Sequence, residues 1–337
     1  MANYRPPRRR PGCLFTFILL LVIGLAVVWF LPPPPEHSIL AGWLTKPAAT
    51  EGVDESPPLD EVWSVGSGTN KVVRIPLTGL IMLDDTASGI FGGPSPSAMA
   101  LRAIQRATAD HDVRAIIMEI DSGGGGITAS DILYHALMTF KARDNRRRVV
   151  TLCGDMAASG AYYIALASDR IIARPTTITG SIGVIIQSLN VRELAERYGI
   201  ADMTYKSGEN KDLLNPLGEE SATKRRIVQS VVDAMQQRFV SLVATHRKIP
   251  ADELPLLTDG RIFTADSALA NGLIDDIGYW EDAVSQTESL LDVPDIIIYR
   301  YEESFTFSSL LSALREISPR TWFGNRDSAR LQYRLSL

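Results

Sequence analysis

Apolar and polar residues alternate in short blocks along the chain after about residue 70, and the blocks predict strands and helices in turn. Apolar runs rich in β-branched residues predict buried strands at residues 72–82, 113–120, 149–153, 170–173 and 182–186. Apolar residues spaced three and four apart predict helices at residues 97–109, 128–141, 159–167 and 191–198. A chain that alternates strand and helix in this way forms a mainly parallel sheet with helices, so we expect the α/β class.

A longer helix is predicted at residues 219–246, where one face carries an apolar stripe. Spacings of three and four are typical of the buried side of a helix. We expect this stripe to lie in the core or in a subunit interface. Its members are Ile227, Val228, Val231, Val232, Met235, Phe239, Leu242 and Val243.

The amino terminus contains a segment suited to a lipid bilayer. Residues 14–31 are uncharged and mostly apolar, and as a helix at about 1.5 Å per residue they extend about 27 Å, close to a bilayer core. Arg8, Arg9 and Arg10 favour a cytoplasmic amino terminus, so the rest of the chain is expected in the periplasm or outside the cell. A cleaved signal peptide is the competing interpretation, but no small-x-small cleavage site precedes the prolines at 32–35.

These features divide the chain into five parts. We expect a basic cytoplasmic terminus at 1–13, a single-pass anchor in the inner (plasma) membrane at 14–31, and a Pro-rich flexible tether at 32–70. A globular domain is expected at 71–300. The tail at 301–337 mixes apolar patches with Arg and Ser, and we expect it to pack on the domain or form an interface.

Composition narrows the range of functions. The 337 residues are 45% hydrophobic with a mean hydropathy of +0.04, as in a globular chain. Four arginines lie in the first twelve residues, which leaves 30 basic against 39 acidic residues in the remainder. Such an acidic body does not attract phosphates, so no nucleic-acid partner is expected. The two cysteines and four histidines form no closely spaced set, so we expect no zinc module or histidine-rich metal centre.

Two junctions between strand and helix contain residues that could carry chemistry. The turn at 121–126 holds four glycines, which let a ligand approach bare backbone N–H groups. A phosphate loop would end in Gly-Lys-Ser/Thr, which is missing, so an oxyanion-stabilising turn is favoured, with a plain flexible turn as the alternative. At the second junction, Ser159 stands among small residues where a helix begins. By itself such a serine is more often a helix cap than a nucleophile.

A serine nucleophile needs a base, and the histidines are poorly placed to supply it. His246 is the only histidine after Ser159, and it lies in the predicted long helix. Lysine acts as a base when burial disfavours its charged form. Lys206 and Lys211 are the candidates, although by composition alone both would be ordinary solvated lysines.

At these residues the chain resembles a known family, the signal peptide peptidase A (SppA) type of membrane-bound serine protease, which has the ClpP/crotonase fold. The resemblance extends from about residue 71 to 284 and rests on five motifs that occur in the family's order. They are the turn at 121–125, the nucleophile segment at 156–160, the segment at 179–184, the lysine motif at 206–212, and the closing motif at 259–264 with 272–275.

The resemblance implies a role for each matching position. Ser159 would be the nucleophile, Lys211 the general base, and Ser181 the hydroxyl that orients the lysine amine. The donors to the oxyanion would be backbone N–H groups of Gly160 and of Gly124 or Gly125. The chain departs from the family's pattern at three positions, which are Gly123 for a proline, Asn215 for a serine and Ala161 for a glycine.

The function implied is that of a membrane-anchored serine endopeptidase with a Ser-Lys dyad, which cleaves short hydrophobic peptides such as signal-peptide remnants. Short family members assemble into rings whose sites combine serine and lysine from adjacent subunits, whereas long members carry two tandem repeats. This chain has one repeat, so we expect a homo-oligomer with shared sites. The alternatives are a crotonase-like acyl-CoA enzyme and a catalytically silent membrane scaffold.

Overall fold

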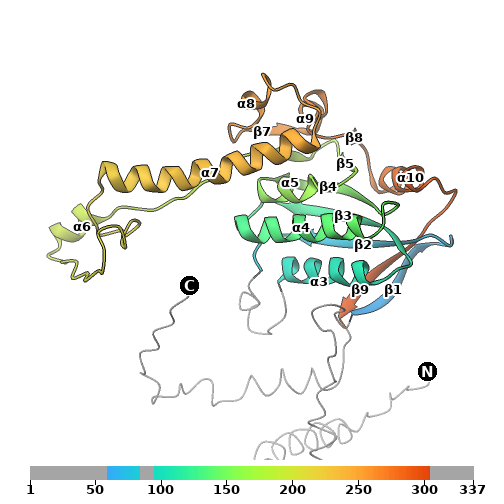
Figure 1. The fold of residues 1–337 in the computed structure, drawn as a ribbon, viewed down its shortest axis with the longest axis horizontal. Coiled ribbons are helices and arrows are strands. Elements are labelled where there is room, and N and C mark those ends of the chain that lie inside the picture. The colour runs from blue at the N-terminus through green and yellow to red at the C-terminus, as the bar shows by residue number, and fades with distance from the viewer. Residues whose placement is uncertain (1–58, 84–94, 304–337) are drawn as a thin grey trace, which may run out of the picture. The chain divides into compact units, whose positions relative to one another are not determined.

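The computed structural model of the chain describes residues 59–83 and 95–303 (Figure 1). In these residues a nine-stranded sheet has the order β1-β9-β2-β3-β4-β5-β8, with β6 beside the end of β4 and β7 beside β6. The strands are β1 (Leu59–Gly66), β2 (Lys71–Thr78), β3 (Val113–Ser122), β4 (Arg148–Ala158), β5 (Arg170–Ala173), β6 (Ile178–Gly180), β7 (Ile262–Thr264), β8 (Asp276–Ile277) and β9 (Ile297–Glu303). The helices are α3 (Pro96–Ala109), α4 (Ile127–Arg143), α5 (Gly160–Ala165), α6 (Arg192–Arg197), α7 (Ala222–His246), α8 (Leu254–Leu257), α9 (Ala265–Ala270) and α10 (Trp280–Leu291).

The sheet is mainly parallel, as the alternation of strands and helices predicts. The strands from β2 to β8 in the sheet order pair in parallel, and so do β2 with β9 and β4 with β6. Among the described residues, only the β1–β9 and β6–β7 pairs are antiparallel. Parallel strands have their carboxyl-terminal ends at the same edge of a sheet, so the segments that follow β3, β4 and β6 meet there.

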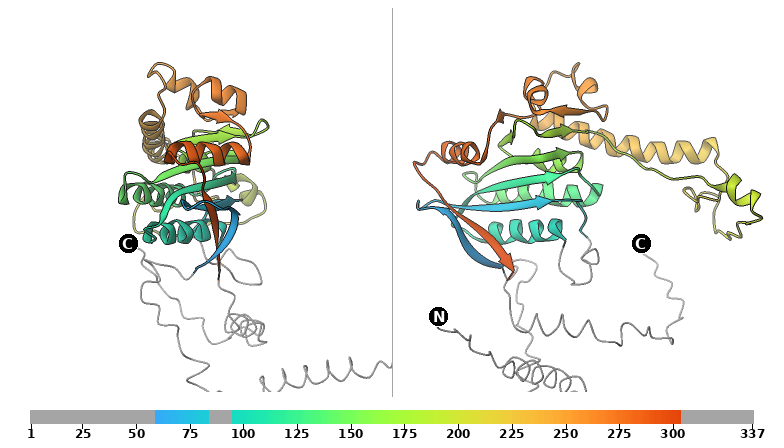
Figure 2. Two further views of the ribbon diagram at one scale, coloured as in Figure 1. Left: turned by 90° about the vertical axis from the view of Figure 1, so that its right-hand side faces the viewer. Right: turned by 180° about the vertical axis from the view of Figure 1, so that it is seen from behind.

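Helices cover both faces of the sheet. In β2, Val73 belongs to the large apolar cluster that contains residues of α3 and α4, whereas Val72 belongs to a second cluster against Trp280 and Val284 of α10. Figure 2 shows α3 and α4 on one side of the sheet and α10 on the other. Because both faces are covered, the central strands are apolar almost throughout, which explains their continuous apolar runs in the sequence.

Four of the five predicted strands are present, and the prediction at residues 182–186 is wrong. This segment has no regular structure, and the strand in this part of the chain is β6. β6 ends because Gly180 and Ser181 have φ angles of 87° and 48°, which an extended strand does not contain. The apolar run that follows leaves the sheet, and the Ile185 side chain is 79% exposed.

The folded domain extends past both of its predicted boundaries. β1 lies inside the range 32–70 that we expected to be a tether, and β9 crosses the expected boundary at residue 300. β1 pairs with β9, and β9 pairs with β2, so both belong to the main sheet. β1 is an edge strand with mostly exposed side chains, so it lacks the apolar run that identifies the other strands in the sequence.

No helix in residues 59–83 and 95–303 is both long enough and apolar enough to cross a membrane. The predicted anchor at 14–31 and the cytoplasmic segment at 1–13 lie outside the described residues, as does the tail beyond residue 303.

The helix α7 supports a projection that we call the arm (residues 183–235), and the rest of the described chain is the body. Figures 1 and 2 show α7 extending from the sheet to α6 and the loop after it. With 25 residues, α7 is about 37 Å long. Its two buried residues, Phe239 and Val243, lie in its carboxyl-terminal half, in the core of the body. Only this half of the predicted stripe therefore contributes to the core.

Candidate active site

Ser159 occupies a strained turn between β4 and α5. Its φ and ψ are 55° and −123°, and it is one of three non-glycine residues with positive φ among those described. Such a conformation costs about 1–3 kcal/mol and persists only where the surrounding structure enforces it. The Ser159 N–H donates to the Gly180 carbonyl at 2.8 Å, and the Tyr163 N–H donates to the Ser159 carbonyl at 3.0 Å. The residue is half-buried and therefore partly accessible to solvent.

Ser181 lies beside Ser159 because β4 and β6 are parallel neighbours. Their register pairs Ala158 with Gly180, the last residues of the two strands, and each of these residues is followed directly by one of the two serines. Ser181 also has positive φ, at 48°, and its N–H donates to the Arg261 carbonyl at 2.7 Å. The closing motif thus contributes a backbone contact that holds Ser181 in this conformation.

The glycine turn after β3 reaches the same place. Gly124 has a φ of 101°, and a Cβ atom at this position would lie 2.7 Å from the Gly160 nitrogen and 2.9 Å from Ser159 Cβ. A Cβ atom at Gly160 would lie 3.3 Å from the Gly125 nitrogen and 2.3 Å from Ser130 Oγ. The predicted oxyanion glycines therefore surround the backbone of Ser159 at distances that leave no room for larger residues.

The N–H groups near Ser159 differ in whether they already have a hydrogen-bond acceptor. The Gly124 N–H donates to Ser122 Oγ at 3.0 Å, and this hydroxyl in turn donates to the Gly79 carbonyl at 2.5 Å. The N–H groups of Gly125 and Gly160 donate to no other described residue. Two backbone donors are thus available for a ligand next to Ser159, whereas the donor of Gly124 is already used.

The structure does not bring the candidate lysines to Ser159 within one chain. Lys206 and Lys211 lie in the loop between α6 and α7, at the outer end of the arm. Among the described residues, no hydrogen bond or ion pair joins residues 199–220 to β4, β6 or α5. Lys206 Nζ donates to Asp212 Oδ1 at 2.9 Å and to the Glu209 carbonyl at 3.1 Å. Lys211 is exposed, and its amine has no partner among the described residues.

The remaining nucleophilic and basic groups near the core are not available for catalysis. Burial raises the pKa of the Cys153 thiol to about 12, so the thiolate does not form near neutral pH. His246 Nε2 lies 2.7 Å from Tyr134 Oη, and burial lowers the pKa of this histidine. This hydrogen bond to Tyr134 agrees with the expectation that His246 does not act as the base.

Two contacts made by α7, just beyond the arm, could not be expected from the sequence. Arg238 binds Asp131 of α4 at 2.5 Å and the Tyr163 hydroxyl at 3.0 Å, and Tyr163 also donates to Asp131 at 2.5 Å. Gln236 Nε2 donates to the carbonyl of Ile182, next to Ser181, at 3.3 Å. These partners are far apart in the sequence, and no motif marks them. They fasten the arm to the body close to both serines.

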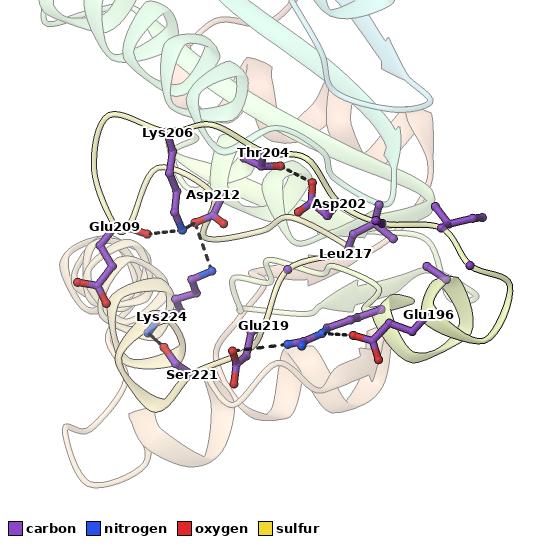
Figure 3. A pocket seen from close by; sticks show the side chains of 16 residues that line it. Glu196, Asp202, Thr204, Lys206, Glu209, Asp212, Leu217, Glu219, Ser221 and Lys224 are labelled. Carbon is purple, nitrogen blue, oxygen red and sulfur yellow. Dashed lines mark hydrogen bonds and ion pairs between the residues drawn. The ribbon is translucent and has the colours of Figure 1, made fainter.

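A cavity lies at the outer end of the arm, and its lining does not include Ser159. It has a volume of about 750 Å³ and is lined by residues of α6, the following loop and the first turn of α7 (Figure 3). Its lining is mixed in charge and includes Lys206, Asp212 and Lys224. The loop that carries Lys211 forms part of its lining, although Lys211 itself does not line the cavity.

The mainly parallel sheet, with a strained serine at the start of a helix and unpaired amide groups next to it, fits the ClpP-like class of serine proteases. Residues 141–294 match Peptidase family S49, a range that contains Ser159, Ser181 and Lys211. The "Putative signal peptide peptidase SppA" of Enterococcus faecium is 33% identical over 269 residues, which cover 79% of this chain and 74% of the relative. The chain belongs to this family, the SppA type of serine protease.

Longer relatives match as well. Protease 4 of Salmonella typhi is 29% identical over 252 residues, which are 72% of this chain and 39% of that protein. The chloroplastic serine protease SPPA of Arabidopsis thaliana is 28% identical over 241 residues, which are 69% of this chain and 34% of that protein. The family membership favours a protease over the acyl-CoA enzyme that the sequence leaves as an alternative.

Proposed function

We propose that this protein is a membrane-anchored Ser-Lys endopeptidase that cleaves short hydrophobic peptides, such as signal-peptide remnants, at sites shared between copies of the chain. The observation that carries the proposal is the division of the site. Ser159, Ser181 and two unpaired amide groups lie together on the body, whereas the free lysine lies at the outer end of the arm.

Ser159 acts as the nucleophile in this proposal. Its Oγ attacks the carbonyl carbon of the scissile peptide, and the oxygen of that carbonyl becomes an oxyanion. The N–H groups of Gly125 and Gly160 donate to the oxyanion, since both lack partners and lie next to Ser159. The Gly124 N–H is held by Ser122, so Gly125 is the donor from the turn. Each such donor contributes about 10²–10³-fold to the rate in enzymes of this kind.

Lys211 acts as the general base. Its neutral amine accepts the Ser159 hydroxyl proton and later gives it to the leaving amine, after which a water molecule hydrolyses the acyl-enzyme by the same route. Lys206 is unsuited to this role because Asp212 and the Glu209 carbonyl hold its ammonium group. Ser181 orients the lysine amine through its hydroxyl without adding a charge.

Assembly of several copies completes the site in this proposal. Lys211 is exposed in the single chain, and a base of this type needs burial to favour its neutral form. The arm also exposes many large apolar side chains, which a second copy would cover. Those more than 70% exposed are Ile185, Leu189, Tyr198, Met203 and Tyr205. In the amino-terminal half of the apolar stripe on α7, Val231 and Met235 are exposed as well.

Membrane anchoring completes the proposal. Residues 14–31, with the arginines before them, support a single-pass anchor in the plasma membrane and an exported catalytic body. Hydrophobic peptides concentrate in the bilayer, so an anchor holds the site near its substrates. The name signal peptide peptidase carried by the Enterococcus faecium relative agrees with this substrate class.

Mixing two inactive variants tests the shared site. Ser159→Ala and Lys211→Ala should each be inactive alone, and co-assembly should restore activity at about a quarter of the sites if the copies mix at random in a ring. Mixed oligomers that form but remain inactive would contradict shared sites. Labelling of Ser159 by a serine-directed phosphonate, together with peptide cleavage, separates a peptidase from a catalytically silent scaffold.

A further inference from the structure

The loop that carries Lys211 is held by an ion cluster at its base. Lys206 Nζ lies 2.9 Å and Lys224 Nζ 3.2 Å from the same oxygen, Asp212 Oδ1. Figure 3 shows both amines pointing toward this carboxylate from opposite sides. Hydrogen bonds from the two lysines hold the pKa of Asp212 below its usual range, so the carboxylate stays charged. Asp212 is adjacent to Lys211 in the chain, so the cluster acts on the residue next to the proposed base.

The cluster fastens a tight turn to a rigid helix. Lys206 closes the turn by reaching both Asp212 and the Glu209 carbonyl, and the Lys211 N–H donates to the Gly208 carbonyl at 3.2 Å. Lys224 belongs to the first turn of α7, and its N–H is capped by Ser221 at 3.2 Å. The turn is therefore linked to the long helix by a side-chain contact one residue from Lys211.

The residues of the cluster and the proposed base differ in their exposure to solvent. The Asp212 and Lys224 side chains are 13% and 12% exposed, whereas Lys211 is exposed and has no partner among the described residues. If Asp212 were free, its carboxylate could pair with the neighbouring Lys211 and keep that amine charged. Because Lys206 and Lys224 occupy it, the amine of Lys211 remains available.

We infer that Lys206, Asp212 and Lys224 form a positioning clamp, which presents the Lys211 amine to the site on a neighbouring copy. The inference rests on the proposed Ser-Lys function and adds to it the residues that set the position of the base. The three act through Lys211 and do not touch substrate. Because a base misplaced by about 1 Å can cost on the order of 10²-fold in rate, loss of the clamp lowers kcat and leaves substrate binding unchanged.

The variants Asp212→Asn and Lys224→Met test the clamp in the full-length protein. Each should lower kcat by about 10–100-fold with an unchanged KM and an unchanged oligomeric state. Lys224→Arg keeps the ion pair and should restore most of the activity. Arg225→Met is the matched control, because Arg225 is the next residue on α7 and makes an exposed ion pair with Glu220 at 2.9 Å. It should keep kcat within about twofold of the wild type.

The mixed oligomer gives a sharper test, because it separates the copy that donates lysine from the copy that donates serine. Asp212→Asn placed in the Ser159→Ala copy should lower the restored activity about tenfold or more, since that copy supplies Lys211. The same change in the Lys211→Ala copy should have no effect. Equal losses in both copies, or none in either, would overturn the clamp. If Lys211→Ala alone stays active, the proposed dyad itself fails, which is a different result.

Discussion

Replacing Gly124 by alanine tests the geometry proposed for the oxyanion site. The added Cβ would lie 2.7 Å from the Gly160 nitrogen and 2.9 Å from Ser159 Cβ. Ordinary contacts between such atoms begin near 3.4 Å, so the nucleophile and one oxyanion donor must move apart from the turn by about 0.5–0.7 Å. The φ of 101° at this position is also unfavourable for alanine.

The expected losses can be worked out from these two effects. Backbone strain of about 1–3 kcal/mol lowers the melting temperature by about 2–12 °C for a domain of this size. Displacement of one oxyanion donor lowers kcat by about 10²–10³-fold. We therefore expect a folded, assembled Gly124→Ala protein whose activity is lost far more severely than its stability.

Gly126→Ala is the matched control from the same turn. Gly126 has a φ of −62°, and its added Cβ would meet only the Ile81 carbonyl oxygen at 3.6 Å and Ala129 Cβ at 3.7 Å. This variant should keep wild-type kcat and change the free energy of unfolding by less than about 1 kcal/mol, because the restriction of the unfolded chain by alanine is offset by the loss of glycine at the N-cap of α4. The assays are steady-state cleavage of a hydrophobic peptide and thermal unfolding. Equal kcat in the two variants would refute the proposed approach of Gly124 to Ser159.

Three further predictions concern the base, the topology and the attachment of the arm. Lys211→Ala should abolish peptide cleavage, whereas Lys206→Ala should keep substantial activity because Lys224 still ties Asp212, the residue next to Lys211, to the helix α7; the reverse result would reject the assignment. Protease added to intact spheroplasts should digest the catalytic body, and digestion only after lysis would reject the proposed orientation. Burial alone would raise the pKa of Asp131, but hydrogen bonds from Tyr163 and Arg238 hold it below its usual value. Its contribution to stability is therefore present above about pH 4 and lost as the pH falls through the lower folded-state pKa, and Asp131→Asn should flatten this acid dependence in denaturant unfolding.

Local sequence patterns predicted correctly the helices and strands whose apolar residues are buried in the core. Residues 170–173 form the predicted strand without any shift, and the helix at 97–109 differs from the observed α3 by one residue. The strand belongs to the central sheet and the helix packs on it, so the apolar residues of both are buried in the core. The pattern failed at 182–186, where Ile182 is buried but Ile185 and Ile186 are exposed, and where a strand has few apolar residues, as in β1.

The sequence by itself determined the α/β class, the family and the residues of the proposed Ser-Lys site, because these depend on periodicity and on motifs that are contiguous in the chain. Only the tertiary structure decided how these residues are distributed. Parallel register places Ser159 beside Ser181, and the hydrogen bond to Ser122 leaves Gly125, not Gly124, with a free N–H. The long α7 helix carries Lys211 away from both serines. Distances of this kind arise from strand pairing and helix length between segments remote in sequence, and no local pattern encodes them.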